Sequence, residues 1–224
     1  PLPYYISAFL VLISFDVLTS AKIMMILGFL LSVLSMFLLS RYFFGTAGGI
    51  LSAILYVYTP YHAVQLYVRG SIGELWAYAI LPLVVLGIIK KDKILTGIAL
   101  AFLILSHNLT IIMVLPMIIV LMIILVLTEK NKRPLFQSFT VSLLIGFSLS
   151  AFFWLPALVE KKYTAVNQMI NEQFNPLLHF VKPLQLWYSP WGYAGSAPQG
   201  EIDGRSVQIG KPNLILTITA ISLI

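Results

Sequence analysis

An arginine and a glutamate stand five residues apart in a short polar segment between two apolar runs. The segment, residues 60–74, contains Arg69 and Glu74, and His62 lies near its start. A guanidinium presents its N–H groups as a planar fork that fits the oxygens of a phosphate. A carboxylate can take a proton from a hydroxyl group or accept hydrogen bonds from a sugar. We therefore predict a site in which Arg69 holds a phosphate and His62 is a further substrate contact, with Glu74 as the candidate catalytic residue within this chain.

The two charged residues also have structural interpretations. The sequence Ser71-Ile-Gly-Glu74 before an apolar run fits a capping box, in which Ser71 and Glu74 bond to the first turn of a helix. Arg69 stands where a cation can anchor a helix end among lipid headgroups. The sequence leaves both interpretations open.

A second pair of polar residues, His107 and Asn108, interrupts a long apolar run. Polar side chains at such positions in a membrane protein are costly and often functional, so both residues are candidates for substrate binding. The alternative is a hydrogen bond that stabilises a helical hairpin.

A third candidate region is the polar stretch that begins near Glu160 and contains Trp187 and Trp191 among turn-forming residues. Exposed aromatic rings beside hydrogen-bonding groups suit the binding of a sugar by stacking. Tryptophan is equally expected at a membrane interface. We predict Glu160 and the two tryptophans as substrate-binding residues, with the interfacial interpretation left open.

The element that positions the central candidates is the run 94–128, which holds no formally charged residue. Basic clusters flank it: Lys90, Lys91 and Lys93 before, and Lys130, Lys132 and Arg133 after. One membrane-spanning helix needs about 20 residues, so this run suits two short passes. Two passes return the chain to its starting side, and the bias of short loops towards Lys and Arg puts both clusters in the cytoplasm.

The composition supports the same class of protein. The chain is 59% hydrophobic and 10% charged, and its mean hydropathy of +0.95 requires lipid as the solvent for most of its surface. The net charge of +6 comes from short loops between apolar runs, so we expect no nucleic-acid partner. The absence of cysteine excludes disulfides and thiolate chemistry.

We therefore predict an all-α, polytopic transmembrane helical bundle. Residues 1–224 form part of one membrane domain, as a fragment of a longer chain. An interfacial helix is expected over 2–15, an outer loop over 157–211, and the start of a truncated span over 212–224. About six spans are expected near residues 21–40, 43–59, 75–89, 94–106, 109–128 and 134–156.

Several stretches together resemble one family of prokaryotic membrane proteins. They are Pro1-Leu-Pro-Tyr-Tyr5, the stretch from Tyr61 through Tyr67-Val-Arg-Gly-Ser-Ile-Gly-Glu74, Ser106-His-Asn108, Phe153-Trp-Leu-Pro-Ala-Leu-Val-Glu160 and Gln185-Leu-Trp-Tyr-Ser-Pro-Trp-Gly192. The family is labelled 6-pyruvoyl-tetrahydropterin synthase-related membrane protein. The label does not imply pterin chemistry, since the soluble synthase binds zinc through clustered histidines and His62, His107 and His179 lie far apart here.

That family is similar to the GT-C glycosyltransferases, which move a sugar from a polyprenyl-phosphate donor to an acceptor outside the cytoplasm. The resemblance implies a GT-C-like fold in the prokaryotic cytoplasmic membrane, with the long loop extracytoplasmic. It places the essential acid upstream of Pro1 and makes Arg69, Glu74, His107, Asn108 and Glu160 candidate cavity residues. The expected partners are membrane lipid and a polyprenyl-phosphate-linked sugar.

The sequence does not identify a cofactor or a metal ligand in this chain, and a divalent metal in the full-length protein stays open. Two other functions are compatible with the same residues. One is a transporter or flippase of a lipid-linked or polar solute, since short helices around a polar cavity serve that purpose too. The other is a non-catalytic membrane protein of envelope assembly.

Overall fold

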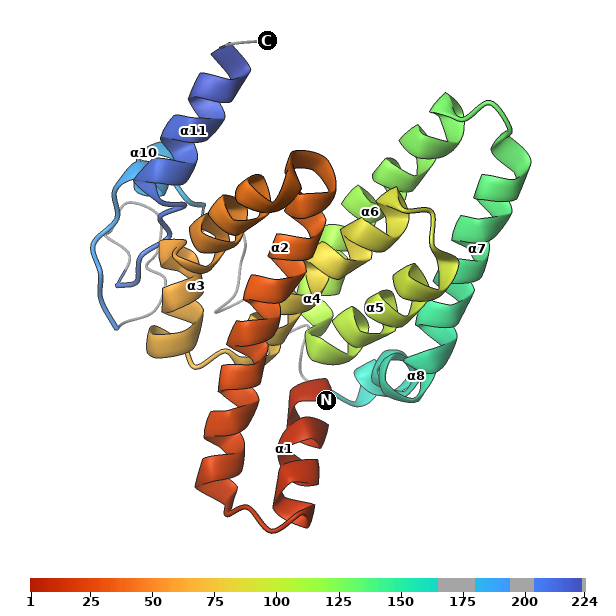
Figure 1. Ribbon diagram of the computed structural model, residues 1–224. Coiled ribbons are helices and arrows are strands. Elements are labelled where there is room, and N and C mark those ends of the chain that lie inside the picture. Colours follow the sequence, from red (N-terminus) through yellow and green to blue (C-terminus); the bar gives the residue numbers. More distant parts are fainter. Residues whose placement is uncertain (165–179, 194–203, 223–224) are drawn as a thin grey trace. The chain divides into compact units, whose positions relative to one another are not determined.

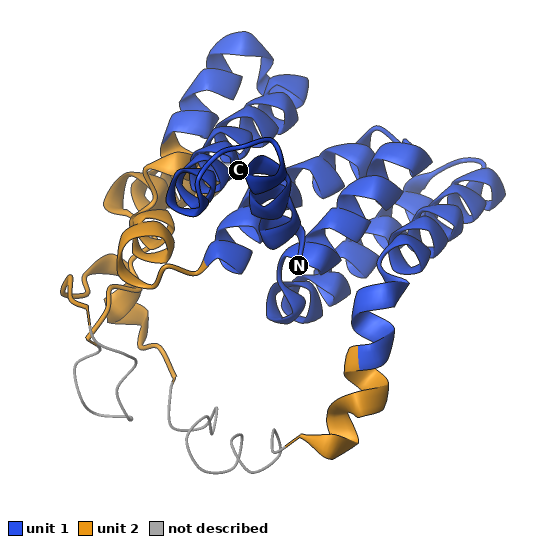
Figure 2. Cartoon of the chain, turned by 90° about the horizontal axis from the view of Figure 1, so that it is seen from below, with its two compact units in different colours: residues 1–54, 72–156 blue, residues 55–71, 157–224 orange. Residues whose placement is uncertain are grey.

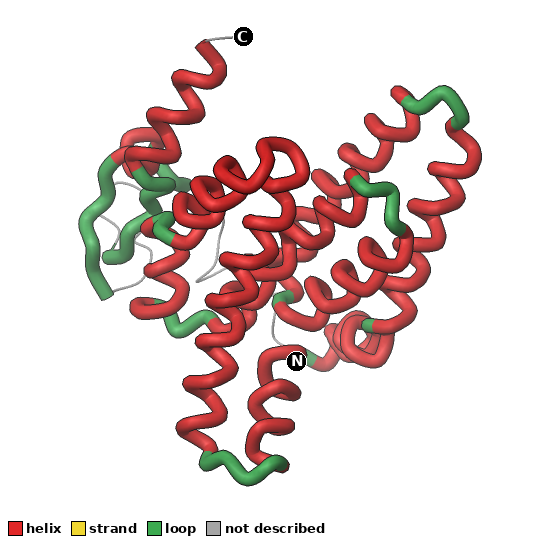
Figure 3. Tube along the Cα trace, viewed as in Figure 1, coloured by secondary structure: helices red, strands yellow, loops and turns green. Residues whose placement is uncertain are grey.

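The computed structural model describes residues 1–164, 180–193 and 204–222 of the chain. Of these residues 82% are helical and none lies in a strand, which confirms the all-α fold (Figure 3). The chain divides into two compact units, coloured separately in Figure 2. Unit 1 comprises residues 1–54 and 72–156, and unit 2 comprises residues 55–71 and 157–224.

Unit 1 contains most of the long helices. They are α1 (Leu2–Leu12), α2 (Val17–Val57) as far as residue 54, α4 (Ile72–Ile89), α5 (Lys93–Ser106), α6 (Asn108–Thr128), α7 (Lys132–Leu149) and the first part of α8 (Ala151–Glu160) (Figure 1). The chief partners of α5 are α4 and α7, and most residues of α5 are buried. The core of unit 1 therefore forms around α5.

Small residues let α5 and α7 approach closely. A Cβ atom added at Gly97 of α5 would lie 2.7 Å from Cβ of Ile145, and one added at Gly146 would lie 2.7 Å from Cδ2 of Leu100. The contacts advance in the same direction along both helices, so α5 and α7 run parallel. Such packing of small residues is what brings helices together in lipid, where apolar area alone gives no preference.

The junction of α2 and α4 depends on one tryptophan. The indole N–H of Trp76 donates to Sδ of Met24, at 3.2 Å, and the ring is buried. A Cβ atom on Gly28 would lie 2.9 Å from Nε1 of Trp76, so the glycine leaves the space in which the ring packs. The buried indole N–H thus has the partner that its burial requires.

The turn between α4 and α5 is closed by hydrogen bonds at both helix ends. The N–H of Lys91 donates to O of Ile88 at 3.0 Å, and that of Asp92 donates to O of Gly87 at 2.9 Å. Together with the left-handed φ of 57° at Lys91, these bonds form a Schellman motif that ends α4. Lysine thus occupies a position that more often holds glycine.

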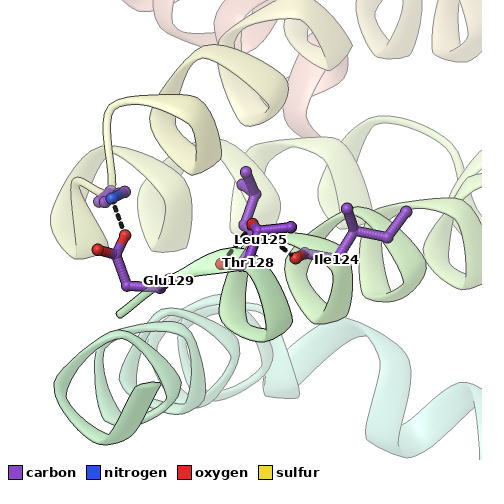
Figure 4. A network of polar contacts seen from close by, with 5 residues as sticks. Ile124, Leu125, Thr128 and Glu129 are labelled. Atoms are coloured by element: carbon purple, nitrogen blue, oxygen red, sulfur yellow. Dashed lines mark hydrogen bonds and ion pairs between the residues drawn. The ribbon is translucent and has the colours of Figure 1, made fainter. Parts of the chain in front are cut away.

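The same turn begins α5 and is tied to the end of α6. A carboxylate oxygen of Asp92 accepts from the N–H groups of Ile94 and Leu95, as expected of an N-cap residue. Lys91 forms an ion pair with Glu129, which stands just after α6 (Figure 4). The hydrogen bond and charge of Lys91 hold the pKa of Glu129 below its ordinary value.

Among the described residues, three helices are long and apolar enough to cross a membrane: α2, α4 and α6. A fourth candidate is the pair α7 and α8, which is bent by 70° at a short break. The helices α1 and α5 are apolar but shorter than 18 residues. The chain is therefore a membrane protein with several apolar helices, and the count of six passes stays a prediction.

Two of the expected spans lie in the same long helix, α2, which is interrupted at one glycine. The ranges 21–40 and 43–59 both fall largely within α2, where Gly45 departs from helical geometry with φ 68° and ψ −171°. No atom lies within 4 Å of a Cβ built at this glycine, so a side chain would have space here. Glycine is favoured at this position because other residues rarely adopt its positive φ.

Unit 2 consists of short elements joined by polar contacts. They are the end of α2, α3 (Pro60–Ala63), the π-helix η1 (Val64–Val68), the end of α8, the 3₁₀ helix η2 (Lys161–Tyr163), α10 (Pro183–Trp187) and α11 (Lys211–Ser222). The amide of Asn213 in α11 donates to Oγ1 of Thr59 at 3.0 Å and to O of Ile209 at 3.1 Å. Asn213 therefore joins segments that lie far apart in sequence.

Candidate functional site

The predicted site residues are distributed over both units. Glu74, His107 and Asn108 belong to unit 1, whereas His62, Arg69, Glu160, Trp187 and Trp191 belong to unit 2.

The guanidinium of Arg69 is held by two side chains of its own segment. Its Nη1 donates to Oε1 of Gln65 at 2.9 Å and to the hydroxyl of Tyr61 at 3.4 Å. Gln65 is 2% exposed, so the amide that orients the arginine is fixed in the interior, while the arginine itself is exposed. An exposed cation with a buried support is suited to binding an anion.

The backbone that carries Arg69 has an unusual geometry. The N–H of Arg69 donates to O of Val64, five residues earlier, at 2.9 Å, and η1 is a π-helical turn. Gly70 follows in the left-handed region, with φ 56°, and starts the connection to α4. Single π-turns are uncommon and frequently occur at functional sites.

His62 lies in the interior of unit 2. Its side chain is 1% exposed, and its Nδ1 lies 3.2 Å from O of Val57. A carbonyl only accepts, so Nδ1 carries the proton in this bond. Burial lowers the pKa of the imidazole below its ordinary value, against a smaller opposite effect of the bond to Val57. The geometry gives His62 a structural position beneath the Arg69 segment, and its contact with substrate stays a prediction.

The first turn of α4 lies against the junction of α5 and α6. A Cβ atom on Gly73 would lie 2.8 Å from O of Ser106 and 3.0 Å from Cδ2 of His107. Glu74 is the next residue, so two of the candidates predicted from separate motifs belong to one region of unit 1. The helix begins at Ile72, which puts Ser71 and Glu74 at the positions that a capping box requires.

His107 caps α6. Its Nδ1 accepts from the N–H of Thr110 at 3.3 Å and lies 2.9 Å from the hydroxyl of the same residue. Oδ1 of Asn108 accepts from the N–H of Leu109 at 2.9 Å. Both side chains thus satisfy backbone groups at the turn between α5 and α6, a structural role close to the hairpin interpretation. A substrate contact of either residue remains a prediction.

The aromatic part of unit 2 is held by a serine. Ser189 is 1% exposed; its Oγ accepts from the N–H of Val207 at 3.4 Å, and its carbonyl accepts from the amide of Gln208. These bonds fix the segment that carries Trp187 and Trp191, which are 41% and 49% exposed.

The ammonium of Lys211 lies 5.6 Å from the ring centroid of Trp187 in a cation–π contact. This contact covers part of one ring and joins the start of α11 to the end of α10. Glu160 ends α8 and is exposed. The remainder of the predicted outer loop, residues 165–179 and 194–203, lies outside the described residues, and so does His179.

Sequence reasoning missed three residues that shape this region: Gln65, Tyr61 and Asn213. Gln65 stands four residues before Arg69, and this spacing could have indicated their contact on a helix. The link from Asn213 to Thr59 had no sequence signal, because 154 positions separate the two residues. Within the described part of the chain, no group of three or more His, Asp or Glu side chains could hold a metal ion.

Together, the apolar helices and the polar turns between them define an all-α, multi-pass membrane protein. The chain belongs to the family described as "6-pyruvoyl-tetrahydropterin synthase related domain; membrane protein", whose sequence model matches residues 1–197. Neither a curated protein nor a solved structure matches the chain.

Proposed function

We propose that this protein is a membrane glycosyltransferase of the GT-C type, which moves a sugar from a polyprenyl-phosphate donor to an extracytoplasmic acceptor. The observation that carries the proposal is the exposed guanidinium of Arg69, oriented by Gln65 and Tyr61 on a π-helical turn. In the sequence this turn lies between α2 and α4, two helices that are apolar enough to cross a membrane, and we expect a lipid phosphate to reach the arginine while the attached sugar stays in water.

The reaction would be a displacement at the anomeric carbon of the sugar. The acceptor oxygen forms a bond to that carbon, the bond from the carbon to the phosphate oxygen breaks, and polyprenyl phosphate leaves. Arg69 would stabilise the charge that develops on the leaving phosphate. A carboxylate would take the acceptor proton. If the protein is GT-C-like, this acid would stand upstream of Pro1, and Glu74 is the candidate within the chain.

The test is sugar transfer by the full-length protein, normalised to folded protein. Arg69→Lys keeps the charge but loses the planar fork. Loss of one charge-assisted contact costs about 1.5–3 kcal/mol, so transfer should fall roughly 10- to 150-fold. Arg133→Lys, an exposed arginine in the first turn of α7, is the matched control and should retain activity.

Glu74→Gln separates the roles of the glutamate. Glutamine can complete a capping box but carries no charge. A folded, inactive Gln variant supports a catalytic or ligand-binding role, and an active one indicates a structural role. Wild-type transfer rates for both Arg69→Lys and Glu74→Gln would show that the site is elsewhere.

A transporter or flippase is the second candidate, and the broken helices favour it. The chain bends by 70° between α7 and α8, and Gly45 interrupts α2. Discontinuous helices often border the substrate sites of transporters. In proteoliposomes, movement of a fluorescent polyprenyl-phosphate-linked sugar between the leaflets, with no chemical conversion, would support this candidate over the enzyme.

A further inference from the structure

A surface groove in unit 1 lies between the α4–α5 turn and the first turns of α7. Its volume is about 860 Å³, and it is open to the surface. Charged and polar residues line part of it, and exposed apolar residues line the rest; those used below are Lys91, Lys93, Gln137, Ile94, Phe136 and Val141. None of these residues belongs to the proposed transfer site.

The polar part of the groove is positively charged. Lys91 and Lys93 outnumber Asp92, the one carboxylate of the lining, which accepts two N–H bonds of α5. Lys91 forms an ion pair with Glu129, whereas no described carboxylate forms an ion pair with Lys93. The surrounding segments 90–93 and 129–133 carry six bases against two acids, a net charge of +4.

The rest of the lining is apolar. Ile94, Phe136 and Val141 are 51%, 62% and 38% exposed and line the groove. A second cavity, of about 380 Å³, lies between α6 and α7 and shares Phe136 and Thr140 with the groove. Its lining is almost wholly hydrocarbon, with Thr140 as the single polar residue. Apolar grooves next to α7 thus continue from the basic end of unit 1 towards its middle.

We propose that this groove binds an anionic phospholipid. The phosphate would lie against Lys93 and Lys91 with the amide of Gln137 as a further donor, and an acyl chain would lie along Ile94, Phe136 and Val141. The basic residues of the groove match the phosphate of such a lipid, and its apolar residues match an acyl chain. Both groups of residues lie where helices α5 and α7 begin. Clusters of basic residues next to membrane-spanning helices attract anionic headgroups.

The experiment uses the full-length protein in an uncharged detergent. Phosphatidylglycerol is titrated in, and bound lipid is counted by native mass spectrometry, with phosphatidylcholine as the uncharged comparison. Lys93→Gln removes one cation at the start of a helix. A cation is unfavourable at this positive end of the helix dipole, so its removal should not destabilise the fold. One lysine near a membrane surface is worth about 1 kcal/mol, so the affinity for phosphatidylglycerol should fall about fivefold.

Two further variants make the test specific. Lys130→Gln removes a lysine of the same basic region that does not line the groove, and it should leave the bound lipid unchanged. Val141→Phe adds a ring inside the groove at an exposed position and should exclude the acyl chain without disturbing the core. Equal losses in Lys93→Gln and Lys130→Gln would show a diffuse basic surface and overturn the proposal. Unchanged binding in Lys93→Gln or Val141→Phe, or equal binding of phosphatidylcholine, would also overturn it.

Discussion

Gly97 lies at the closest approach of α5 and α7, and its replacement by alanine tests how tightly the core of unit 1 is packed. The new Cβ would lie 2.7 Å from both Cβ and Cγ2 of Ile145 and 3.0 Å from O of Ser142. Carbon atoms in contact prefer about 3.5–4.0 Å. The Cβ of Ile145 is attached to the backbone, so no change of rotamer removes it. The helices would therefore have to separate.

Two opposing effects set the size of the change. Alanine is favoured over glycine within a helix by about 1 kcal/mol. Overpacking of a close-packed core costs about 1–3 kcal/mol, and a contact that involves backbone atoms belongs in the upper part of that range. Gly97→Ala should therefore lower the free energy of unfolding by roughly 1–2 kcal/mol. The assay is SDS-induced unfolding in mixed micelles, followed by tryptophan fluorescence.

A second background isolates the contact. Ile145→Gly removes the Cβ that the new methyl group would meet, so in this background Gly97→Ala should be neutral or stabilising. The effect of Gly97→Ala on the free energy of unfolding should thus be destabilising in the wild type and neutral or stabilising in Ile145→Gly. A double-mutant cycle measures this difference. If Gly97→Ala is at least as stable as the wild type, or destabilises equally in both backgrounds, α5 and α7 are not packed as described.

Two other predictions concern pH and topology. Burial lowers the pKa of His62, so as the pH falls below about 6.5 the unfolded chain takes up a proton more readily than the folded protein, and the free energy of unfolding should decrease. Thermal unfolding of the wild type and of His62→Gln between pH 5 and 8 would check this; an equal pH dependence of both would contradict it. The chain has no cysteine, so Lys132→Cys and Trp191→Cys can be labelled singly in intact cells with a membrane-impermeant reagent. Labelling from outside is expected at position 191 alone, and labelling at 132 would refute the predicted orientation.

The sequence determined where the helices α5 and α6 begin and end. The uncharged run 94–128 was predicted to break at His107, and α5 ends at Ser106 while α6 begins at Asn108. This break could be predicted because the information is local: a polar pair in an apolar run and an N-cap side chain act within four residues. The family likeness could likewise be recognised from short motifs, and the family is confirmed over residues 1–197.

The tertiary structure alone decided which apolar helix is central. The helices α5 and α6 are both strongly apolar, yet α5 is mostly buried, whereas α6 buries only Ile111, Ile118 and Met122. In lipid an apolar side chain is satisfied by acyl chains and by protein alike, so hydropathy does not distinguish the two environments. The close approach at Gly97 and Gly146 depends on how the surfaces of α5 and α7 fit together, which the sequence pattern does not reveal.

The same reason applies to the candidate site. Arg69 and Glu74 could be proposed from residue type alone, since their chemistry is local. The contact of Gly73 with Ser106 and the bond of Asn213 to Thr59 join residues that are distant in sequence. Such contacts arise only when complete helices are packed, because each depends on a backbone approach or an amide orientation that no single segment specifies.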